Sequence, residues 1–409
     1  MAAGSRGPAI AMAARILNET AAMLGAERLV TVTSSHVDGC LYHGDSGTHF
    51  AERLASEGGR VAVPTTLNVG ALDLLHPGRV QFDPRTAEMA RRMMVAYEQL
   101  GCVPSWTCAP YQAGHRPALG EHVAWGESNA VVFCNSVLGA RTNRLGDFLD
   151  ICAALCARAP YTGLHRDENR RARVVVDTRA LSDALKRLDA FYPVLGAWLG
   201  AEIGSDVAAL IGLPAAIPED SLKALGAAAA SSGAVGLFHI VGVTPEAPDL
   251  AAATGGQPPA RSIVLTAAML RAARDRLSTA AAGTDRIDAV AVGSPHFSLA
   301  EFAALDRLIG GGRFKVPFYA CTGRAVLGEI ERNGMLARLG EAGVEFVTDT
   351  CVVVAPILPK AGGVLMTNSG KFAHYATPNT GFATVYGSLA DCVASALAGR
   401  VTRDERLWS

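Results

Sequence analysis

The segment DAVAVGSPH (288–296) shows a pattern that recurs along the chain, an apolar run that passes directly into small and polar residues. A strand that is apolar throughout is typical of a parallel sheet covered by helices on both faces. Helical patterns such as PRTAEMARRMMVAYEQLG (84–101) separate some of these runs. The alternation predicts an α/β protein with mostly parallel sheets flanked by helices. Runs of the same kind recur at 27–36, 58–68, 129–139, 234–248, 260–270, 315–323, 343–354 and 362–370.

The length of 409 residues predicts two or three structural units. An alanine-rich, helical zone at about 180–230 precedes the second group of expected strands. We therefore expect a first α/β unit over 1–235, with the loops PTTLN, TCAPY and NSVLGARTNR. A second α/β unit is expected over 236–409, with the loops GSPH, DTC and TNSGK.

Composition narrows the range of partners and locations. Lys and Arg number 37 against 38 Asp and Glu, so no electrostatic attraction to nucleic acid or to an anionic membrane is expected. No run approaches the roughly 20 apolar residues of a membrane span. Arg15 and Glu19 interrupt the apolar N-terminus, which indicates an amphipathic helix rather than a secretory signal. We expect a cytoplasmic protein.

Small and polar residues follow several of the expected strands. In parallel sheets, ligands bind beyond the carboxyl ends of the strands. The placement therefore predicts that these loops converge on one polar pocket. The clusters are TSSH (33–36), PTTLN (64–68), GSPH (293–296), ACTG (320–323), TDTC (348–351) and TNSGK (367–371).

Two of the nine cysteines lie in similar loops, although no C-x-x-C pair occurs in the chain. Cys108 and Cys351 each directly follow a threonine, in SWTCAPY (105–111) and TDTCVVVAP (348–356). In a reducing compartment, each could be a buried apolar thiol, a catalytic thiolate or a metal ligand. Distant loops can supply the thiolates of an iron–sulfur cluster when the fold brings them together. The residues alone leave these interpretations open.

Other polar segments also allow more than one interpretation. NSVLGARTNR (135–144) is typical of a capped helix start, or of a clamp in which a guanidinium holds a carboxylate. TNSGKFAHY (367–375) has donors suited to an anion, but Asn-Ser-Gly-Lys is also ordinary turn chemistry. A histidine lies beside serines or a carboxylate in TSSHVDG, GEHVAWGESNAV and GSPHFS. One such histidine is more often structural, but the recurrence favours a functional site.

Eight segments share their order with the motifs of one family, and they span the chain from about residue 10 to about residue 395. They are PTTLN (64–68), TCAPY (107–111), GEHVAWGESNAVVFCNSVLGARTNR (120–144), GLHRDENR (163–170), GVTPEAP (242–248), GSPHFSLAE (293–301), DTC (349–351) and TNSGKFAHY (367–375). Together they resemble the large, catalytic component of the aconitase X family. The resemblance implies an aconitase-like fold of several α/β units and a hydro-lyase that contains an iron–sulfur cluster.

The resemblance also implies ligands for that cluster. Cys108 and Cys351 match the cysteines of the family's T-C-x-P-Y and D-T-C loops. A third ligand is often the cysteine of a G-C-P-H loop, where this chain has Ser294, and a serine is a poor ligand for soft iron. A [2Fe-2S] cluster is therefore as reasonable as a [4Fe-4S] cluster. The cysteines that could substitute for Ser294 are Cys134, Cys40 and Cys321.

Family members dehydrate cis-3-hydroxy-L-proline or mevalonate 5-phosphate. For this chain the first is favoured, and its product is Δ1-pyrroline-2-carboxylate. Mevalonate 5-phosphate requires an added phosphate site, which basic loops could provide. A third hypothesis is a scaffold that binds a proline-like ligand without turnover, because the third cysteine position is altered.

Roles for individual residues follow from the same resemblance. The proton acceptor stays open among a serine, a histidine and a residue of a partner. The residues expected at the chemistry are Glu127, Ser128, His296 and Lys371. Those expected to line the pocket and hold the substrate are Thr65, Thr66, Asn68, Asn135, Ser136, Arg141, Asn143, Ser369 and Lys371.

The family includes a second component, a small swivelling domain that is either fused or separate. The chain ends at RVTRDERLWS, soon after the last motif, so we expect that domain in a separate small subunit. The expected assembly is a heterodimer in which the small subunit closes over the site.

Overall fold

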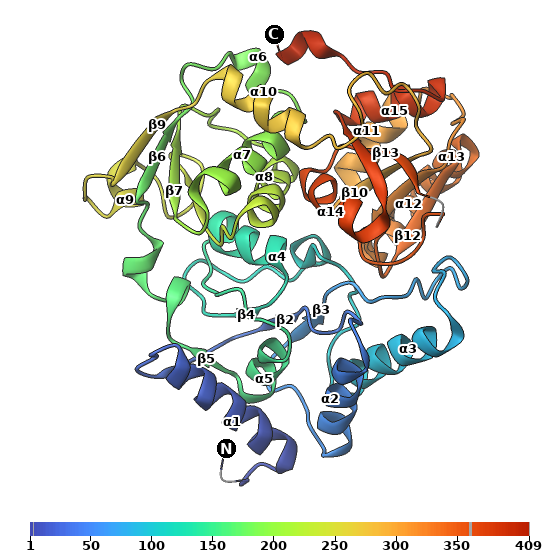
Figure 1. The fold of residues 1–409 in the computed structure, drawn as a ribbon. Coiled ribbons are helices and arrows are strands. Elements are labelled where there is room, and N and C mark those ends of the chain that lie inside the picture. The colour runs from blue at the N-terminus through green and yellow to red at the C-terminus, as the bar shows by residue number, and fades with distance from the viewer. Residues whose placement is uncertain (3, 360–361, 409) are drawn as a thin grey trace.

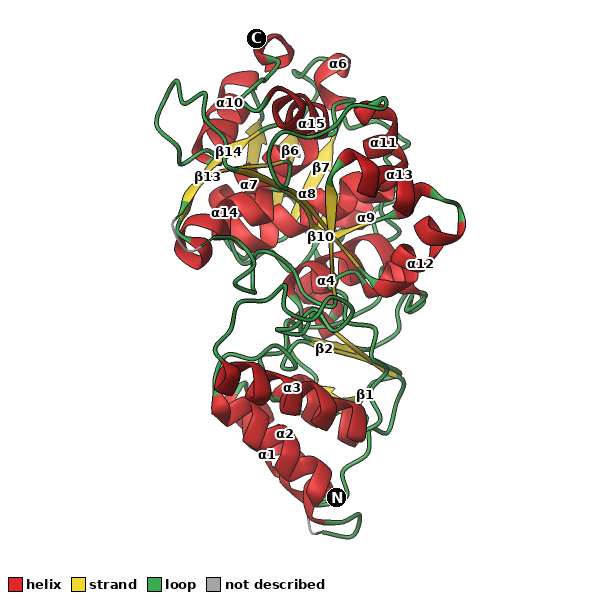
Figure 2. Cartoon of the chain, turned by 90° about the vertical axis from the view of Figure 1, so that its right-hand side faces the viewer, coloured by secondary structure: helices red, strands yellow, loops and turns green. Residues whose placement is uncertain are grey.

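The computed structural model describes residues 1–2, 4–359 and 362–408 and contains three α/β units (Figure 1). The first unit includes the N-terminus and lies at the end of the molecule opposite the C-terminus (Figure 2). Each unit encloses an apolar core of its own. Among the described residues, no helix has the length and apolar character needed to cross a membrane.

The first unit is built on a parallel sheet of three short strands, in the order β3-β2-β4. A separate antiparallel pair joins β1 to β5. The strands are β1 (Leu29–Thr31), β2 (Ser35–Val37), β3 (Thr65–Leu67), β4 (Ala124–Trp125) and β5 (Arg158–Pro160). The helices are α1 (Pro8–Met23), α2 (Asp45–Ser56), α3 (Pro84–Gln99), α4 (Ser128–Phe133), α5 (Leu149–Cys156) and the short turns η1 (Pro110–Ala113), η2 (Cys134–Leu138), η3 (Gly163–His165) and η4 (Asp167–Arg170).

Helix α3 confirms the helix expected over 84–101. Its cap is Asp83, whose side chain accepts hydrogen bonds from the backbone N–H groups of Arg85 and Thr86. Pro84 occupies the first turn, where an N–H group has no partner within the helix. The amphipathic helix expected at the N-terminus is α1, and its buried face consists of Ala9, Ile10, Ala11, Ala13, Ala14, Leu17 and Ala21.

The second unit contains a parallel sheet of four strands, in the order β8-β7-β6-β9. The boundary expected at residue 235 passes through this sheet, because β8 and β9 follow that residue and pair with β7 and β6. The second unit therefore includes chain from both sides of residue 235. Its strands are β6 (Val174–Asp177), β7 (Ala208–Ile211), β8 (Phe238–Ile240) and β9 (Arg261–Val264). Its helices are α6 (Asp183–Lys186), α7 (Phe191–Ile203), α8 (Glu219–Ser232), α9 (Leu250–Thr254) and α10 (Ala267–Arg276).

The third unit contains a parallel sheet of five strands, in the order β12-β11-β10-β13-β14. The apolar run expected over 288–296 forms its central strand, β10, which is buried along its whole length. The strands are β10 (Ala289–Phe297), β11 (Phe318–Thr322), β12 (Val344–Thr348), β13 (Gly363–Thr367) and β14 (Phe382–Tyr386). The helices are α11 (Leu299–Ile309), α12 (Arg324–Arg332), α13 (Met335–Ala342), α14 (Gly370–Thr380), α15 (Leu389–Ala398) and the turn η5 (Glu405–Trp408).

The strand expected over 129–139 is wrong, because this segment forms α4 and the π-helical turn η2. The side chain of Glu127 accepts a hydrogen bond from the backbone N–H of Ala130 at 2.6 Å and so caps α4. Every residue of α4 is buried, and a short buried helix shows the same continuous apolar pattern as a buried strand. Each of the other expected strand runs contains a strand, whereas β4, β5, β6, β7 and β14 were not expected.

Candidate active site

Loops from the first and third units meet at the carboxyl ends of their strands. Asp38, Asn68 and Glu127 follow β2, β3 and β4. Cys351 follows β12, and Lys371 lies in the first turn of α14, which follows β13. Lys371 Nζ donates to Glu127 Oε1 at 2.5 Å and so joins the two sets of loops. Parallel sheets bind ligands at this edge. We call the group formed by Asp38, Asn68, Glu127, Cys351 and Lys371 the centre.

The ion pair of Glu127 and Lys371 is almost fully buried, with 5% and 12% of the two side chains exposed. Burial alone raises the pKa of Glu127, but the adjacent ammonium outweighs it, and the pKa is lowered. Burial alone lowers the pKa of Lys371, but Glu127 and the thiols of Cys108 and Cys351 outweigh it, and the pKa is raised. Both groups are therefore charged at neutral pH. Ser128 Oγ donates to Glu127 Oε1 at 3.2 Å.

The first Thr-Cys loop packs directly against the end of β10. The backbone N–H of His296 donates to Cys108 Sγ at 3.3 Å. The imidazole of His296 has Nδ1 at 3.0 Å from Thr107 Oγ1 and Nε2 at 3.2 Å from the carbonyl oxygen of Thr350. Burial lowers the pKa of His296 to about 4, so the ring is neutral. Both ring nitrogens are engaged, which favours a positioning role over the catalytic role expected for His296.

Cys351 shares this neighbourhood with Cys108. Each thiol is 5% exposed. Burial raises the pKa of Cys108 to about 12 and also raises the pKa of Cys351, while the charge of Lys371 lowers both. A metal bound here must displace the thiol protons, and the nearby ammonium favours that change. The two Thr-Cys loops thus lie at one place.

The implied iron–sulfur cluster can be compared with the donors at the centre. Its usual ligands are soft thiolates, and Cys108 and Cys351 supply two of them. Thr350 Oγ1 and Asn68 Oδ1 are buried and have no hydrogen-bond partner within the described residues, which leaves polar atoms for a further group. In the same parts of the chain, no three His, Cys, Asp or Glu side chains converge closely enough to hold a metal ion. The donors therefore fit two ligands of a cluster, without a third in place.

Two candidates for a third ligand lie close to the centre. Ser294 belongs to the same strand end as His296, and its carbonyl oxygen accepts a hydrogen bond from Ser369 Oγ. Cys321 lies near the end of β11, and its buried thiol interacts electrostatically with Cys351 and Cys108. Of these two candidates, only Cys321 has a soft donor atom, its sulfur.

Two other cysteines considered as ligands have surroundings that differ from those of Cys108 and Cys351. Cys134 is in η2, where burial raises its pKa and the charge of Arg170 opposes that rise. The helical segment places the Cys134 thiol in an apolar cluster, which favours a structural role over the ligand role expected for it. Cys40 Sγ donates to the carbonyl oxygens of Val37 and Asn68, at 3.5 and 3.4 Å. Its thiol already has backbone partners.

The PTTLN loop reaches the centre through Asn68. Asn68 Nδ2 donates to Asp38 Oδ1. Thr65 Oγ1 instead donates to a backbone carbonyl oxygen at 2.9 Å. Thr66 Oγ1 lies between two imidazoles, 2.8 Å from Nδ1 of His36 and 2.7 Å from Nδ1 of His115. Of the three residues expected here to hold substrate, Asn68 has the most direct connection to the centre.

Four residues expected to hold the substrate form a separate network between the first and second units. Each binds the protein's own backbone or a carboxylate, so in this structure the segment 135–144 joins two units. The contacts are Asn135 Nδ2 to the carbonyl oxygens of Thr142 and Gly236, Ser136 Oγ to the N–H of Phe238, Asn143 Nδ2 to the carbonyl oxygen of Thr162, and Arg141 to the carboxylates of Asp167 and Glu246.

Replacing Arg141 with glutamine is expected to lower the stability of the fold and to leave KM within about twofold. The change releases Asp167 and leaves Glu246 paired with Arg170 alone. Because these ion pairs are partly exposed, the loss is about 1 kcal/mol. Thermal unfolding and steady-state kinetics measure the two effects. A tenfold or larger rise in KM with unchanged stability would show that Arg141 binds the substrate.

Asp38 belongs to the centre, although the sequence pattern did not single it out. Burial raises the pKa of Asp38 to about 6, with a further rise from Glu127 and Asp147, while Asn68 and Lys371 oppose it. Asp38 immediately follows β2 and lies two residues after the TSSH cluster. This is the same placement after a strand that marked the neighbouring polar clusters, so the signal was available.

Two other carboxylates hold the loops of the centre in place. Asp150 Oδ2 accepts hydrogen bonds from the backbone N–H groups of Asp38 and Gly39, at 2.6 and 3.0 Å. Asp349 of the D-T-C loop accepts two hydrogen bonds from Arg324, at 2.6 and 2.7 Å. Paired hydrogen bonds of this kind fix the geometry of both loops.

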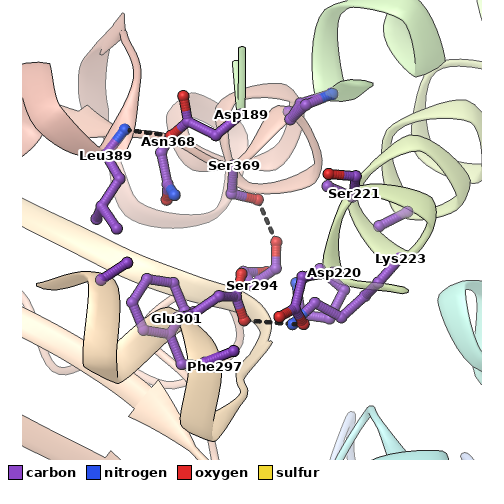
Figure 3. Close-up of a pocket in the computed structure, with 18 of the residues that line it drawn as sticks. Asp189, Asp220, Ser221, Lys223, Ser294, Phe297, Glu301, Asn368, Ser369 and Leu389 are labelled. Atoms are coloured by element: carbon purple, nitrogen blue, oxygen red, sulfur yellow. Dashed lines mark hydrogen bonds and ion pairs between the residues drawn. The ribbon is translucent and has the colours of Figure 1, made fainter. Parts of the chain in front are cut away.

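A cavity of about 510 Å³ lies between α8, the end of β10 and the start of α14 (Figure 3). Ser294 and Ser369 are among the residues that line it, and Figure 3 shows the hydrogen bond between them. Glu127, Lys371 and the two thiols do not belong to its lining. The cavity is therefore adjacent to the centre and separate from the ion pair.

Three family profiles match successive parts of the chain. They are the Aconitase X first domain over residues 1–168, the second domain over 172–275 and the third domain over 287–398. These ranges follow the three sheet-based units of the structure.

Curated relatives match almost the whole chain. A cis-3-hydroxy-L-proline dehydratase from Pseudomonas aeruginosa is 44% identical over 416 residues, which cover 99% of this chain and 70% of the relative. A second protein of that name, from Hypocrea jecorina, is 42% identical over 402 residues and covers 97% and 67%. A phosphomevalonate dehydratase large subunit from Methanothermobacter thermautotrophicus is 37% identical over 387 residues and covers 94% and 93%.

A solved structure of Thermococcus kodakaraensis aconitase X, in its holo-form, has the same fold. It matches with a TM-score of 0.85 and 32% sequence identity, over 96% of this chain and 97% of that chain. The match confirms the predicted α/β fold with mostly parallel sheets flanked by helices. The chain therefore belongs to the aconitase X family, and it is a dehydratase of the hydro-lyase class.

Proposed function

We propose that the chain dehydrates cis-3-hydroxy-L-proline to Δ1-pyrroline-2-carboxylate. The observation that carries the proposal is that Asp38 and Lys371, at strand ends of two units, meet the thiols of Cys108 and Cys351. The choice of substrate follows the relatives that bear its name, which are 44% and 42% identical, against 37% for the phosphomevalonate relative.

The dehydration of a β-hydroxy acid has two chemical obstacles. The α C–H bond beside a carboxylate is weakly acidic, and hydroxide is a poor leaving group. Loss of the α proton and the hydroxyl group, together as water, leaves an enamine that tautomerises to the cyclic imine. The site must therefore hold the carboxylate, receive the α proton and assist the departure of hydroxide.

Lys371 is the residue that we assign to the substrate carboxylate. Its ammonium is buried and charged, and it lies in the first turn of α14, where the helix dipole also favours negative charge. Ser369 caps the helix by accepting a hydrogen bond from the N–H of Phe372. Glu127 fixes the direction of the ammonium. A cation at this position stabilises the negative charge that develops as the α proton leaves.

Asp38 is the group that we assign as proton acceptor. Its pKa of about 6 is close to neutral, where a general base is most effective. Asp38 Oδ1 accepts a hydrogen bond from Asn68, and Oδ2 has no such partner among the described residues. We therefore assign the proton to Oδ2. Glu127 is a weaker base, because Lys371 lowers its pKa.

Cys108 and Cys351 are the residues that would hold an iron–sulfur cluster, of the [2Fe-2S] or [4Fe-4S] type. When bound, the cluster supplies a Lewis acid for the departing hydroxyl group. Cys321 and Ser294 are the candidates for the remaining ligand. The soft thiol of Cys321 suits iron better than the hydroxyl of Ser294.

We also propose that a separate small subunit completes the enzyme. The archaeal relative is named a large subunit, and this chain covers 93% of it. The two hydroxyproline dehydratases are covered to 70% and 67% of their length. A small subunit that closes over the strand ends would exclude water from the reaction.

The substrate is tested on protein reconstituted anaerobically together with its companion subunit. We expect cis-3-hydroxy-L-proline to lose water and mevalonate 5-phosphate to remain unchanged, as followed by mass spectrometry. Dehydration of the phosphate ester alone would assign the other family activity. Binding of hydroxyproline without turnover, by protein that contains no iron or sulfide, would support the scaffold hypothesis.

A further inference from the structure

We propose that Lys223, on α8 of the second unit, is a positioning residue for the loops that carry Cys108 and His296. Its side chain is 2% exposed, and its Nζ donates to the carbonyl oxygen of His296 at 3.2 Å. The N–H of the same histidine donates to Cys108 Sγ at 3.3 Å. One buried ammonium therefore fixes the backbone that contacts the proposed cluster ligand. The inference rests on the proposed function.

A second contact ties Lys223 to the loop of Cys108 itself. Gln112 lies in η1, four residues after that cysteine. When its amide is oriented to suit its neighbours, the nitrogen lies 3.2 Å from the carbonyl oxygen of His296 and the oxygen lies 3.0 Å from Lys223 Nζ. Lys223 therefore joins parts of all three units: its own helix, the Thr-Cys loop of the first unit and β10 of the third.

Two carboxylates keep this ammonium charged. Asp220 Oδ1 lies 2.9 Å from Lys223 Nζ, and Glu301 Oε2 is in direct contact with it (Figure 3). Both carboxylates also accept hydrogen bonds from Ser298. The Ser298 hydroxyl donates to Asp220 at 2.7 Å, and the Ser298 backbone N–H donates to Glu301 at 2.9 Å. A buried ammonium keeps its charge only with such partners. The group thus holds the start of α11 as well as the end of β10.

The cavity of about 510 Å³ gives this role a direct test, because Lys223 is one of the residues that line it (Figure 3). Truncation of Lys223 to alanine opens space toward that cavity. A small alkylammonium ion that enters can then replace the lost donor. A neutral molecule of the same shape cannot supply the charge.

The experiment uses the reconstituted complex with Lys223→Ala. We expect kcat to fall roughly 100-fold, with KM changed less than about threefold, because misplacement of catalytic loops affects the chemical step most. Ethylammonium should restore at least a tenth of the lost rate and return the visible circular dichroism of the cluster toward that of the unmodified protein. Ethanol should do neither. Lys186→Ala is the matched control, since Lys186 is also buried and donates to a backbone carbonyl, that of Gly212, at 2.9 Å.

Lys223→Ala leaves the carboxylates of Asp220 and Glu301 without their partner, which can unfold the protein. A second variant avoids this problem. Lys223→Met combined with Asp220→Asn and Glu301→Gln removes the three charges together, which proteins often tolerate. We expect it to fold, with the same loss of kcat and the same altered cluster spectrum. Unchanged kcat and spectrum in this variant, or equal recovery of Lys223→Ala with ethanol, would overturn the positioning role. If the proposed function is wrong, the unmodified complex itself does not turn over hydroxyproline. In that case the cluster spectra of the variants still test the positioning role of Lys223.

Discussion

Cys108→Ala is expected to lose the visible absorption of the cluster and at least about 1,000-fold in turnover, since the Lewis acid is lost with its ligand. The thiol is one of two soft donors that the structure places beside Lys371. Within the described residues, no three His, Cys, Asp or Glu side chains lie close enough together to hold the iron without this thiol. Iron and sulfide content, absorption and kcat of the anaerobically reconstituted protein measure the effect, and Cys351→Ala should behave in the same way.

The matched control for this substitution is Cys392→Ala. Cys392 is fully buried in the apolar core of the third unit, so its loss should cost about 1 kcal/mol of stability and leave the cluster intact. Cys321→Ala shows whether the third ligand is that thiol, through its effect on iron content. Unchanged absorption with full turnover in Cys108→Ala would remove Cys108 from the ligands and move the cluster elsewhere.

The meeting of distant loops could be predicted from sequence because it follows from strand direction. Parallel strands place their carboxyl ends at one edge, so polar residues after β2, β3, β12 and β13 must lie near one another within each sheet. Asn68, Cys351 and Lys371 were predicted in this way. Asp38 has the same placement, directly after β2, so the same rule applies to it.

The choice of partner for a polar side chain could not be predicted in this way. The guanidinium of Arg141 suits a substrate carboxylate and a protein carboxylate equally well. Its actual partners, Asp167 and Glu246, come from segments whose position depends on the packing of the second unit. Lys223 gave no local signal either, because it is a single lysine in an alanine-rich helix and its role appears only when three units meet.

Secondary structure was least predictable where burial is complete. The helix α4 and a buried strand have the same apolar composition, and only the cap by Glu127 distinguishes them locally. The boundary at residue 235 failed for a related reason. The alanine-rich helix α8 resembles a linker in composition, yet it packs against α7 and connects β7 to β8 of one sheet.

Replacement of Asp38 with asparagine is expected to reduce kcat by about 10²–10⁴-fold, because the proposed proton acceptor is lost. In the unmodified enzyme, kcat/KM should fall as the pH drops below about 6, since protonation of Asp38 removes the base. The residual activity of Asp38→Asn should lack this acidic limb. A pH–rate profile of both proteins measures the change, and a limb that persists in the variant would assign the proton to another residue.

The same substitution should stabilise the fold at neutral pH. Folding raises the pKa of Asp38 from 3.8 to about 6, so its favourable contribution exists below pH 3.8 and is lost as the pH rises through 6. Asparagine carries no charge, retains an oxygen for the hydrogen bond from Asn68 and avoids that loss, which is about 1–2 kcal/mol for a partly exposed carboxyl group. Thermal unfolding at pH 7 should therefore show a higher Tm for Asp38→Asn, with the difference disappearing near pH 4. Asp83→Asn is the control, because asparagine caps a helix as well as aspartate does, and it should change neither activity nor stability. A less stable Asp38→Asn would mean that the fold, rather than the reaction, requires this carboxylate.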